Sequence, residues 1–361
     1  MARLRRADCS VPGITRRKAG KGFYYLDATT GERIRDEDTL ARIASLVLPP
    51  AWTDVWICPW PNGHIQATGF DARGRRQYRY HDRWRERRDS EKFDKMLDFA
   101  RALPGMRCTL EEHLALADMP QQKVLACATR LLDLGFFRIG SEGYAEENDT
   151  FGLATMRKKH ARVDGDVVTF DYTAKGGKRR VQSVVDPAVR DIVTELKSRR
   201  AGGSELLAWR DDAGVWHDVK SVDINTYVKA VTGGDYTAKD FRTWNATVLA
   251  AVALAVSFQA NGTKTSRTRA EARAMQEVAA YLGNTPAVAR SSYVDPRVID
   301  RFRAGQTIVP AIERLAAEEE PGGLSVHGEI EAAVLELLSD GEVTATADEF
   351  DDAVLLDQPA A

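Results

Sequence analysis

The sequence predicts an α+β protein, with a small N-terminal domain built on an antiparallel β-sheet and a larger, mainly α-helical domain. Three observations lead to this division. Before about residue 82 apolar residues alternate between turn signals, whereas afterwards they follow helical spacing. At about residue 311 the balance of charge changes sign. We therefore expect a β-rich domain at 1–88, a helical domain at 89–310 and an acidic tail at 311–361.

The N-terminal domain begins with basic residues and several glycines, so we expect residues 1–20 to form a polar arm. Strand-like segments follow at 22–27, 55–59, 64–69 and 76–81. Asn62-Gly63 predicts a hairpin turn between two of them, because both residues tolerate positive φ. The stretch Asp71-Ala-Arg-Gly74 predicts a second turn.

The last of these segments, Arg76-Gln-Tyr-Arg-Tyr-His81, combines aromatic and basic residues. Alternation along a strand places Tyr78 and Tyr80 on one face and Gln77 and Arg79 on the other. Such a mixture suits a nucleic-acid backbone and its sugars, so we predict that these four residues touch a duplex. The alternative is a sheet with aromatic packing on one face and solvated charges on the other.

The larger domain is predicted mainly from helical spacing and helix-capping signals. Helices are expected at 82–103, 121–134 with a stop at Gly135, 187–200, 222–231 and from 237 to about 260, where Asn261-Gly262 ends the last one. Thr237-x-x-Asp240 and Thr268-x-x-Glu271 resemble capping boxes, and the second predicts the start of a helix that ends at Gly283. Residues 160–184 return to a β pattern around the turn Asp164-Gly165.

Two arginines of this domain, Arg138 and Arg242, are candidate phosphate ligands, whereas Lys175 alone is a weak signal that more often marks a solvated loop. Arg138 follows two phenylalanines, and an arginine so close to a core needs an anion, more commonly a carboxylate than a phosphate. Lys175 precedes two glycines at a hairpin tip, but the pattern is no Walker A motif, so nucleotide hydrolysis is not expected. Arg242 lies early in a helix, where the macrodipole favours an anion.

A short stretch near residue 290 combines a helix stop, a polar residue and a tyrosine. A helix is expected to end at Gly283, with Asn284 next, Thr285 as the N-cap and Pro286 as the first residue of a second helix. Tyr293 follows nine residues after Asn284. Taken alone, this pattern predicts a helical hairpin with a packed or exposed tyrosine.

The net charge of −2 conceals a basic body and an acidic tail. From residue 311 onward there are 14 acidic residues and one basic residue, so residues 1–310 carry 39 acids and 50 bases, or +11. A basic body suggests a polyanionic partner. Within this tail we expect a linker-like break at 318–323 and a short amphipathic helix at 329–338. The tail as a whole should be solvated and partly disordered, with competition against the polyanion as the functional alternative.

The cysteines and the apolar runs indicate the compartment. Cys9, Cys58, Cys108 and Cys127 are widely scattered without a C-x-x-C pair, so neither a zinc site nor a disulfide framework is expected. The longest apolar run, residues 248–256, is too short to span a bilayer, and no signal-peptide core follows the N-terminus. We expect a cytoplasmic protein that needs no metal.

Several of these motifs occur together in the order found in one enzyme family. They are Pro61-Asn-Gly-His-Ile-Gln-Ala-Thr-Gly69, Arg76-Gln-Tyr-Arg-Tyr-His81, Phe136-Phe-Arg-Ile-Gly140, Tyr172-Thr-Ala-Lys-Gly-Gly-Lys178, Lys239-Asp-Phe-Arg-Thr243 and the final Gly283-Asn-Thr-Pro with Ser291-Ser-Tyr293. Over about residues 20–310 the sequence resembles the small type IB DNA topoisomerases, of the poxvirus-like kind found in bacteria. Each motif alone is weak, but their order and spacing are specific.

The resemblance implies a helical catalytic domain of the tyrosine recombinase/topoisomerase IB type. It implies Tyr293 as the nucleophile that forms a 3′-phosphotyrosyl bond, with Arg138, Lys175, Arg242 and Asn284 as its catalytic partners. It further implies a monomer that closes as a clamp around duplex DNA in the nucleoid and relaxes supercoils without ATP. Additional duplex contacts are expected from Tyr144, Lys158, Lys159 and Arg290.

The chemistry of phosphodiester cleavage accounts for these residue types. Two guanidiniums can oppose charge on the non-bridging oxygens, and a lysine can protonate the leaving alkoxide. Asn284 departs from viral and eukaryotic relatives, which generally have histidine there, and asparagine is usual among bacterial members. Because an amide cannot transfer a proton, its expected role narrows to hydrogen bonding.

Two other classes remain open from the sequence. A tyrosine recombinase shares the Arg-Lys-Arg-Tyr arrangement, but recombinases normally have histidine three residues before the second arginine, where this chain has Lys239. Their N-terminal domain is also usually helical, whereas this one is predicted to be β-rich. A non-catalytic DNA-binding protein is the third class, and it predicts no function for the Tyr293 hydroxyl.

Overall fold

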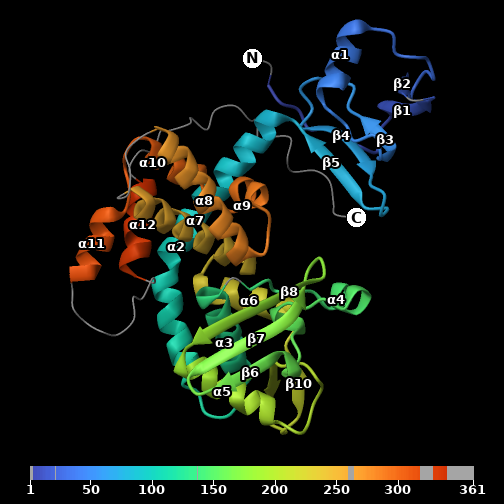
Figure 1. Cartoon of the computed structure of the whole chain (residues 1–361). Coiled ribbons are helices and arrows are strands. Elements are labelled where there is room, and N and C mark those ends of the chain that lie inside the picture. The colour runs from blue at the N-terminus through green and yellow to red at the C-terminus, as the bar shows by residue number, and fades with distance from the viewer. Residues whose placement is uncertain (1–2, 21, 136, 259–263, 318–327, 340–361) are drawn as a thin grey trace. The chain divides into compact units, whose positions relative to one another are not determined.

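The computed structural model describes residues 3–20, 22–135, 137–258, 264–317 and 328–339. Contacts between Cα atoms divide the chain into two compact units, an N-terminal unit that extends to Lys92 and a larger unit that begins at Phe93. The division lies inside a long helix, α2 (Asp82–Leu114), which is coloured blue-green in Figure 1. The expected domain limit at residue 88 falls in the same helix.

The N-terminal unit is a five-stranded antiparallel sheet in the order β2-β1-β3-β4-β5. Its strands are β1 (Ile14–Ala19), β2 (Gly22–Asp27), β3 (Thr53–Ile57), β4 (Ile65–Phe70) and β5 (Arg76–Tyr80). Helix α1 (Glu37–Ser45) packs on this sheet through Ile43, which joins Ile14, Val55, Ile57 and Ala67 in a small core. The predicted β-rich domain is confirmed, and its alternating strands bury one face.

Two predictions for this unit are wrong. Residues 3–20 are no polar arm, because Leu4 and Ala7 are buried and residues 14–19 form β1, whose apolar Ile14 was outweighed by the surrounding arginines. The predicted hairpin between β3 and β4 forms, because these strands pair, but a tight turn at Asn62-Gly63 is wrong, since neither residue has positive φ and the connection runs from 58 to 64. Glycine is needed at 63 because a Cβ would lie 2.5 Å from the Cys58 Sγ. The Asp71–Gly74 turn is confirmed, with Gly74 at φ +70°.

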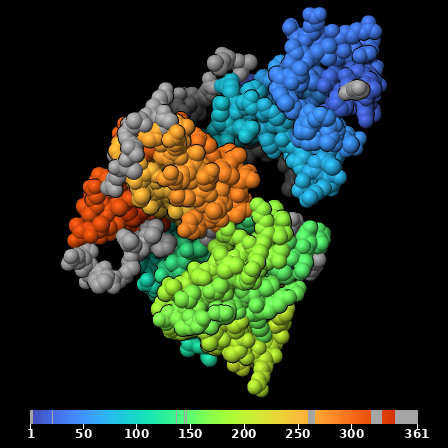
Figure 2. Space-filling view, in the orientation of Figure 1, coloured from blue at the N-terminus to red at the C-terminus, as the bar shows by residue number. Residues whose placement is uncertain are grey.

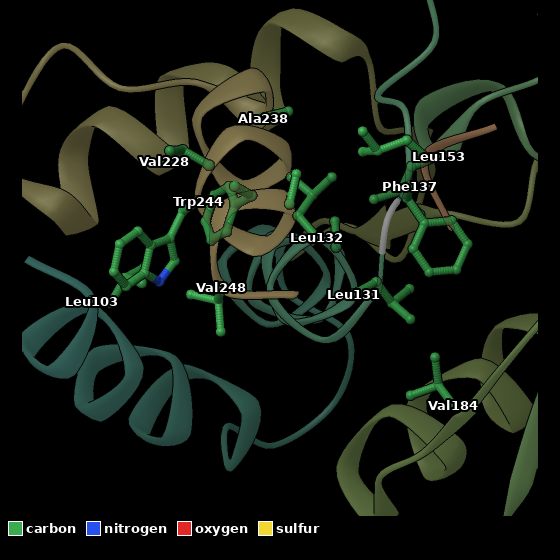
Figure 3. Close-up of a cluster of buried hydrophobic side chains, with 14 of the residues drawn as sticks. Leu103, Leu131, Leu132, Phe137, Leu153, Val184, Val228, Ala238, Trp244 and Val248 are labelled. Atoms are coloured by element: carbon green, nitrogen blue, oxygen red, sulfur yellow. The ribbon is translucent and has the colours of Figure 1, made fainter. Parts of the chain in front are cut away.

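The larger unit is mainly helical and has one continuous core. Its central helix α7 (Ala238–Phe258) packs against α3 (Gln121–Leu134), α6 (Ser221–Thr232), α8 (Lys264–Leu282), α10 (Pro296–Arg303) and α12 (Glu329–Ser339). Figure 3 shows Trp244 and Val248 of α7 among buried side chains that include Leu131 and Leu132 of α3. Helix α7 is long and apolar enough to cross a membrane, yet 61% of its most apolar window is buried, as in a core helix.

Two small sheets complete the larger unit. One is antiparallel in the order β6-β7-β8, from β6 (Ala161–Asp164), β7 (Val167–Ala174) and β8 (Lys178–Val185), and matches the predicted β region. The unpredicted β9 (Ala208–Arg210) and β10 (Trp216–Asp218) form a two-stranded ribbon. The remaining elements are the helices α4 (Glu142–Asn148), α5 (Pro187–Ser198), α9 (Pro286–Ser292) and α11 (Val309–Ala317), and the short 3₁₀ turns η1 (Leu153–Thr155) and η2 (Lys158–His160).

Several helix limits differ from the predictions. Helix α3 has the predicted limits, but α2 continues past Pro104 to Leu114. Thr268 is no N-cap, because α8 has already begun at Lys264, and Glu271 is instead buried and bound by both Nε and Nη2 of Arg303. The Asn261-Gly262 stop lies outside the described residues.

The short amphipathic helix predicted at 329–338 is confirmed as α12 (Glu329–Ser339), but the expected solvated tail does not describe residues 311–317 and 328–339. These residues complete α11 and form α12, and Ile330, Val334 and Leu338 of α12 are buried in the main core. The acidic composition misled the prediction because Glu331 points inward, where Arg107 and Trp244 bind it. Residues 318–327, which include the expected linker, and the acidic run after 340 lie outside the described residues.

Candidate active site

Tyr293 stands at the end of a helix-turn-helix that begins with a glycine stop. Helix α8 ends at Leu282, and Gly283 has φ +64°, which a glycine adopts without strain. The Thr285 hydroxyl then accepts a hydrogen bond from the Val288 N–H, and Pro286 is the first residue of α9. This predicted arrangement is confirmed, and it fixes Tyr293 as the residue that ends α9.

Helix α7 holds both the backbone and the ring of Tyr293. The buried Thr247 hydroxyl lies 3.2 Å from the Tyr293 carbonyl oxygen and also accepts a hydrogen bond from the Asp295 N–H. One turn earlier, the Arg242 guanidinium lies 5.4 Å from the centre of the half-buried Tyr293 ring. Arg242 is 4% exposed and donates to the Leu282 carbonyl at 2.9 Å. The arginine, the tyrosine and the end of α8 are therefore one packed group.

Arg138 approaches this group from the segment after α3. Its Nη2 donates to the Asn284 Oδ1 at 2.6 Å. The segment is fixed behind it, because the Leu153 N–H donates to the Arg138 carbonyl and Gly140, at φ +80°, lies against Gly152. A Cβ on Gly152 would come within 2.4 Å of the Gly140 nitrogen, so both glycines are needed for this close approach.

Asn284 faces the candidate catalytic group with an unused donor. Its Oδ1 accepts from Arg138, while its buried Nδ2 has no hydrogen-bond acceptor among the described residues. The Asn284 side chain also helps to lower the pKa of Tyr293, so this donor lies beside the phenol, where an acceptor that binds from outside the chain could take its hydrogen bond.

Lys175 lies at the tip of the β7–β8 hairpin, as predicted, between Ala174 and two glycines with positive φ. Arg180 on β8 ties this hairpin to the end of α8, since its Nη1 and Nη2 donate to the carbonyls of Ala280 and Tyr281 at 2.9 and 2.5 Å. Figure 2 shows the hairpin in light green against the orange α8–α9 segment. A small pocket between them is lined by Arg138, Tyr172, Ala174, Lys175, Lys178, Arg180, Leu282 and Gly283.

The electrostatics of this group favour an anion. Burial and the neighbouring Arg138 charge lower the pKa of Arg242 to about 10. Burial alone would raise the pKa of Tyr293, but the Arg242 and Arg138 charges outweigh it and lower that pKa below its ordinary value. Clustered cations beside an acidified phenol can stabilise a phosphate and activate a nucleophile at the same place. Among the described residues no group of three His, Cys, Asp or Glu side chains could hold a metal ion.

The residues predicted to touch a duplex lie in both units, and each is described within its own unit. On β5 the Tyr78 and Tyr80 rings stack at 5.9 Å, with Tyr78 exposed, as alternation predicts. On the opposite face Gln77 donates to Asp71, and Arg79 pairs with Asp82 at 2.7 Å. Those two side chains therefore also serve the local fold.

The other four predicted contacts belong to the larger unit. Lys158 donates to the Arg199 carbonyl at 3.0 Å, whereas Lys159 is exposed. Arg290 lies on α9, half exposed, with its Nη1 3.6 Å from the Glu271 carboxylate. Tyr144 is part of α4, but its side chain is outside the described part of the structure. Their contacts with DNA stay predictions.

Two residues that support the site were missed in the sequence. Thr247 sits inside an apolar helix, where its hydroxyl bonds to Thr243 as threonines commonly do, so nothing marked its second contact with Tyr293. Arg180 is one of three basic residues at the start of β8 and resembled a solvated hairpin charge. Only the fold reveals that it holds the α8 end.

Comparisons with known proteins give a consistent result. The profile of the eukaryotic DNA topoisomerase I catalytic core matches residues 81–308, and the profile of the bacterial DNA topoisomerase IB N-terminal domain matches residues 22–71. DNA topoisomerase 1B of Acanthamoeba polyphaga mimivirus is 30% identical over 290 residues, which cover 79% of this chain and 85% of the viral protein.

More distant relatives share parts of the chain. DNA topoisomerase 1B of vaccinia virus (strain Copenhagen) is 20% identical over 237 residues, or 65% of this chain and 71% of its own length. DNA topoisomerase 1 of Daucus carota is 26% identical over 160 residues, or 44% of this chain and 19% of its own length.

Proposed function

Because this chain belongs to the type IB DNA topoisomerases, we propose that Tyr293 is the nucleophile with which it cleaves one strand of duplex DNA. The Tyr293 Oη forms a bond to a backbone phosphorus, and the bond from phosphorus to the 5′-oxygen breaks. The phenol loses its proton, and the 5′-oxygen gains one. The free 5′-hydroxyl strand then rotates, which removes supercoils, and the hydroxyl reverses the attack. Because the phosphotyrosyl ester conserves the bond energy, the cycle needs no ATP or other nucleotide.

The observation that carries this proposal is the pairing of Tyr293 with two guanidiniums that also act on its pKa. Arg242 and Arg138 oppose the charge that develops on the non-bridging oxygens, and the buried Asn284 Nδ2 donates to one of them. Lys175, on its glycine-flanked hairpin tip, protonates the departing 5′-oxygen. These side chains supply the charge and the proton, so the chemistry requires no metal ion.

We further propose that the monomer closes as a clamp around the duplex. The β5 residues Gln77, Tyr78, Arg79 and Tyr80 would contact it from the N-terminal unit, and Tyr144, Lys158, Lys159 and Arg290 from the larger one. If many of these cations neutralise phosphates, affinity should fall steeply with salt. A Kd that stays flat between 50 and 200 mM salt would contradict the clamp.

Relaxation of a supercoiled plasmid without ATP or Mg²⁺ tests the activity. The wild-type protein should unlink the plasmid stepwise, and Tyr293→Phe, which loses only the hydroxyl, should bind DNA but leave the plasmid supercoiled. Recombinant products between two sites without relaxation would instead support a tyrosine recombinase. Equal relaxation by Tyr293→Phe would contradict the assignment of the nucleophile.

We also propose that the enzyme acts on nucleoid DNA in the cytoplasm. All four cysteines are free thiols, as suits a reducing compartment. A fluorescent fusion should co-localise with the nucleoid, and an envelope signal would contradict this placement.

A further inference from the structure

Helix α12 lies beyond the part of the chain that matches the catalytic-core profile, which ends at residue 308. It is nevertheless packed into the larger unit. Ile330, Val334 and Leu338 are 5% exposed or less and join the main core, and the helix contacts α7, α10 and α11. An ordinary docked helix would need only this apolar stripe.

The same face of α12 also carries a buried carboxylate, Glu331, which is 8% exposed. It accepts hydrogen bonds from the Arg107 Nη1 at 2.6 Å and Nη2 at 3.1 Å, and from the Trp244 Nε1 at 2.8 Å. Burying a carboxylate is costly unless it is paired and hydrogen-bonded in good geometry. Glu331 meets this condition through donors on two different helices, α2 and α7.

Arg107 links Glu331 to the end of α3, the segment that precedes Arg138. It donates two hydrogen bonds of 2.9 Å to the Asp133 carboxylate, which is fully buried in the last turn of α3. The Asp133 carbonyl accepts from the Asn245 Nδ2 at 3.0 Å, so the same turn of α3 is also tied directly to α7. The chain leaves α3 two residues later and reaches Arg138 three residues after Gly135.

Trp244 carries the other contact to the helix that holds Arg242. It lies two residues after Arg242 on α7 and is 1% exposed, so its ring is fixed by packing and its Nε1 by Glu331. The next turn of α7 presents Thr247 to the Tyr293 carbonyl. The Glu331 carboxylate therefore links the end of α3, which precedes Arg138, with α7, which carries Arg242.

From this geometry we propose that Glu331 is a positioning residue for DNA cleavage, which makes α12 a functional extension of the catalytic core. The inference rests on the proposed function of Arg138 and Arg242. Glu331 touches neither the tyrosine nor the DNA. Its directional hydrogen bonds fix the position of the α3 end relative to α7. An apolar contact alone would let these two elements slide past each other. Displacing a catalytic group by about 1 Å costs on the order of 10²-fold in rate.

The test compares full-length Glu331→Gln with Glu336→Gln. Both remove one carboxylate from α12, but Glu336 is exposed. Each protein reacts with a suicide duplex in single turnover across a range of pH, and the rate of covalent adduct formation is measured together with the DNA Kd and the Tm. Trp244→Phe is the second test variant, since it removes the Nε1 donor of α7 and keeps a smaller aromatic ring at the same buried position.

We expect Glu331→Gln to slow adduct formation about 10- to 100-fold with a DNA Kd within about twofold of wild type. Its rate should rise at higher pH than the wild-type rate, because the Arg242 and Arg138 charges that favour Tyr293 ionisation are displaced. Trp244→Phe should slow the reaction about 2- to 10-fold in the same direction, as expected for one hydrogen bond. Glu336→Gln should match wild type in rate, pH profile and Kd.

A lower Tm in Glu331→Gln with an unchanged rate and pH profile would overturn the proposal and leave Glu331 as a stabilising residue only. If Glu331→Gln does not fold, an unchanged rate and pH profile in Trp244→Phe overturns it equally. Wild-type protein that forms no adduct at all would contradict the proposed function itself, so the two failures are distinguishable.

Discussion

Arg107 and Arg242 are both buried in the larger unit, yet their surroundings shift their pKa values in opposite directions. Burial alone disfavours the charged form of either residue. At Arg107 the hydrogen bonds to Asp133 and Glu331 overcome burial and raise the pKa. At Arg242 burial, reinforced by the Arg138 charge, lowers the pKa to about 10. One cluster balances its charge within the chain, while the other gathers like charges around a tyrosine.

This difference separates two functions of a buried cation. Arg107 stabilises the fold, whereas Arg242 is positioned by the fold to bind a ligand. An arginine that is paired with buried carboxylates stabilises the folded state. Removing it leaves those carboxylates buried without a partner, which is costly because they are desolvated. A buried cation that destabilises the folded state indicates a function other than stability. For Arg242 and Arg138 that function would be to bind a phosphate between them. The following variants test this difference between Arg107 and Arg242.

Arg107→Met should give the largest effect. It leaves Asp133 and Glu331 as buried carboxylates without their shared partner, so the free energy of unfolding should fall by about 3–5 kcal/mol. Urea unfolding followed by tryptophan fluorescence measures this. A change below about 1 kcal/mol would show that the Arg107 cluster contributes little to the fold.

Arg242→Met should instead act on the reaction. Losing one preorganised charge should slow adduct formation about 10²–10³-fold, or about 2.7–4 kcal/mol in the barrier. Stability should rise, because lowering the Arg242 pKa to about 10, well below the ordinary value of arginine, implies a folding cost of roughly 3 kcal/mol, offset by about 1 kcal/mol for the lost Leu282 bond.

The sign follows from linkage: a cation with a lowered folded-state pKa destabilises the folded state at every pH below about 10, and the cost fades as the pH rises from there towards the ordinary pKa of arginine. The stability advantage of Arg242→Met should therefore be constant from pH 7 to 9 and shrink above pH 10. A variant that is less stable than wild type at neutral pH would contradict the comparison.

Asn284→Asp places a carboxylate next to Arg138, so that this arginine becomes paired within the chain as Arg107 is. A carboxylate facing Arg138 should add a charged hydrogen bond and raise stability by about 1.5–3 kcal/mol. It should also occupy the charge meant for phosphate, so DNA cleavage should fall. Thermal unfolding and single-turnover cleavage measured on one preparation check both halves, and Asn284→Ala, which adds no charge, serves as the control.

Thr247→Val should have the smallest effect. It keeps the side-chain shape but removes the hydroxyl that binds the Tyr293 carbonyl and the Asp295 N–H, at a cost of about 1–2 kcal/mol in stability. Adduct formation should slow only a few-fold, in proportion to the looser tyrosine. Thr243→Ser, which keeps a hydroxyl on the same helix, should match wild type in adduct formation and lose only about 1 kcal/mol of stability for its buried methyl group.

The contrast also explains what could be predicted from the sequence. Thr285-Pro286, Gly283 and the paired glycines after Lys175 act through local backbone preferences, so the segments that present Tyr293, Asn284 and Lys175 were predicted correctly. Contacts between distant segments leave no local signal. Glu331 looked like one more acid on the predicted short helix of an acidic tail, although it binds Arg107, 224 residues away in the chain.

The wrong predictions have the same origin. Asn62-Gly63 has the composition of a tight turn, but the Cys58 Sγ beside Gly63 sets the actual reason for glycine there. Ile14 lies among arginines, and only pairing with β2 and β3 makes its segment a strand. Tertiary packing decided each case, and packing is what a local pattern omits.

The central claim is that Tyr293, set beside two clustered guanidiniums, becomes covalently joined to DNA. Trapping the protein on a nicked suicide duplex, followed by protease digestion and mass spectrometry of the DNA-linked peptide, tests it most directly. We predict a single adduct on Tyr293 carrying the 3′-phosphate end of the cleaved strand, formed without ATP or metal. An adduct on another tyrosine, attachment to a 5′ end, or binding with no adduct would contradict the account.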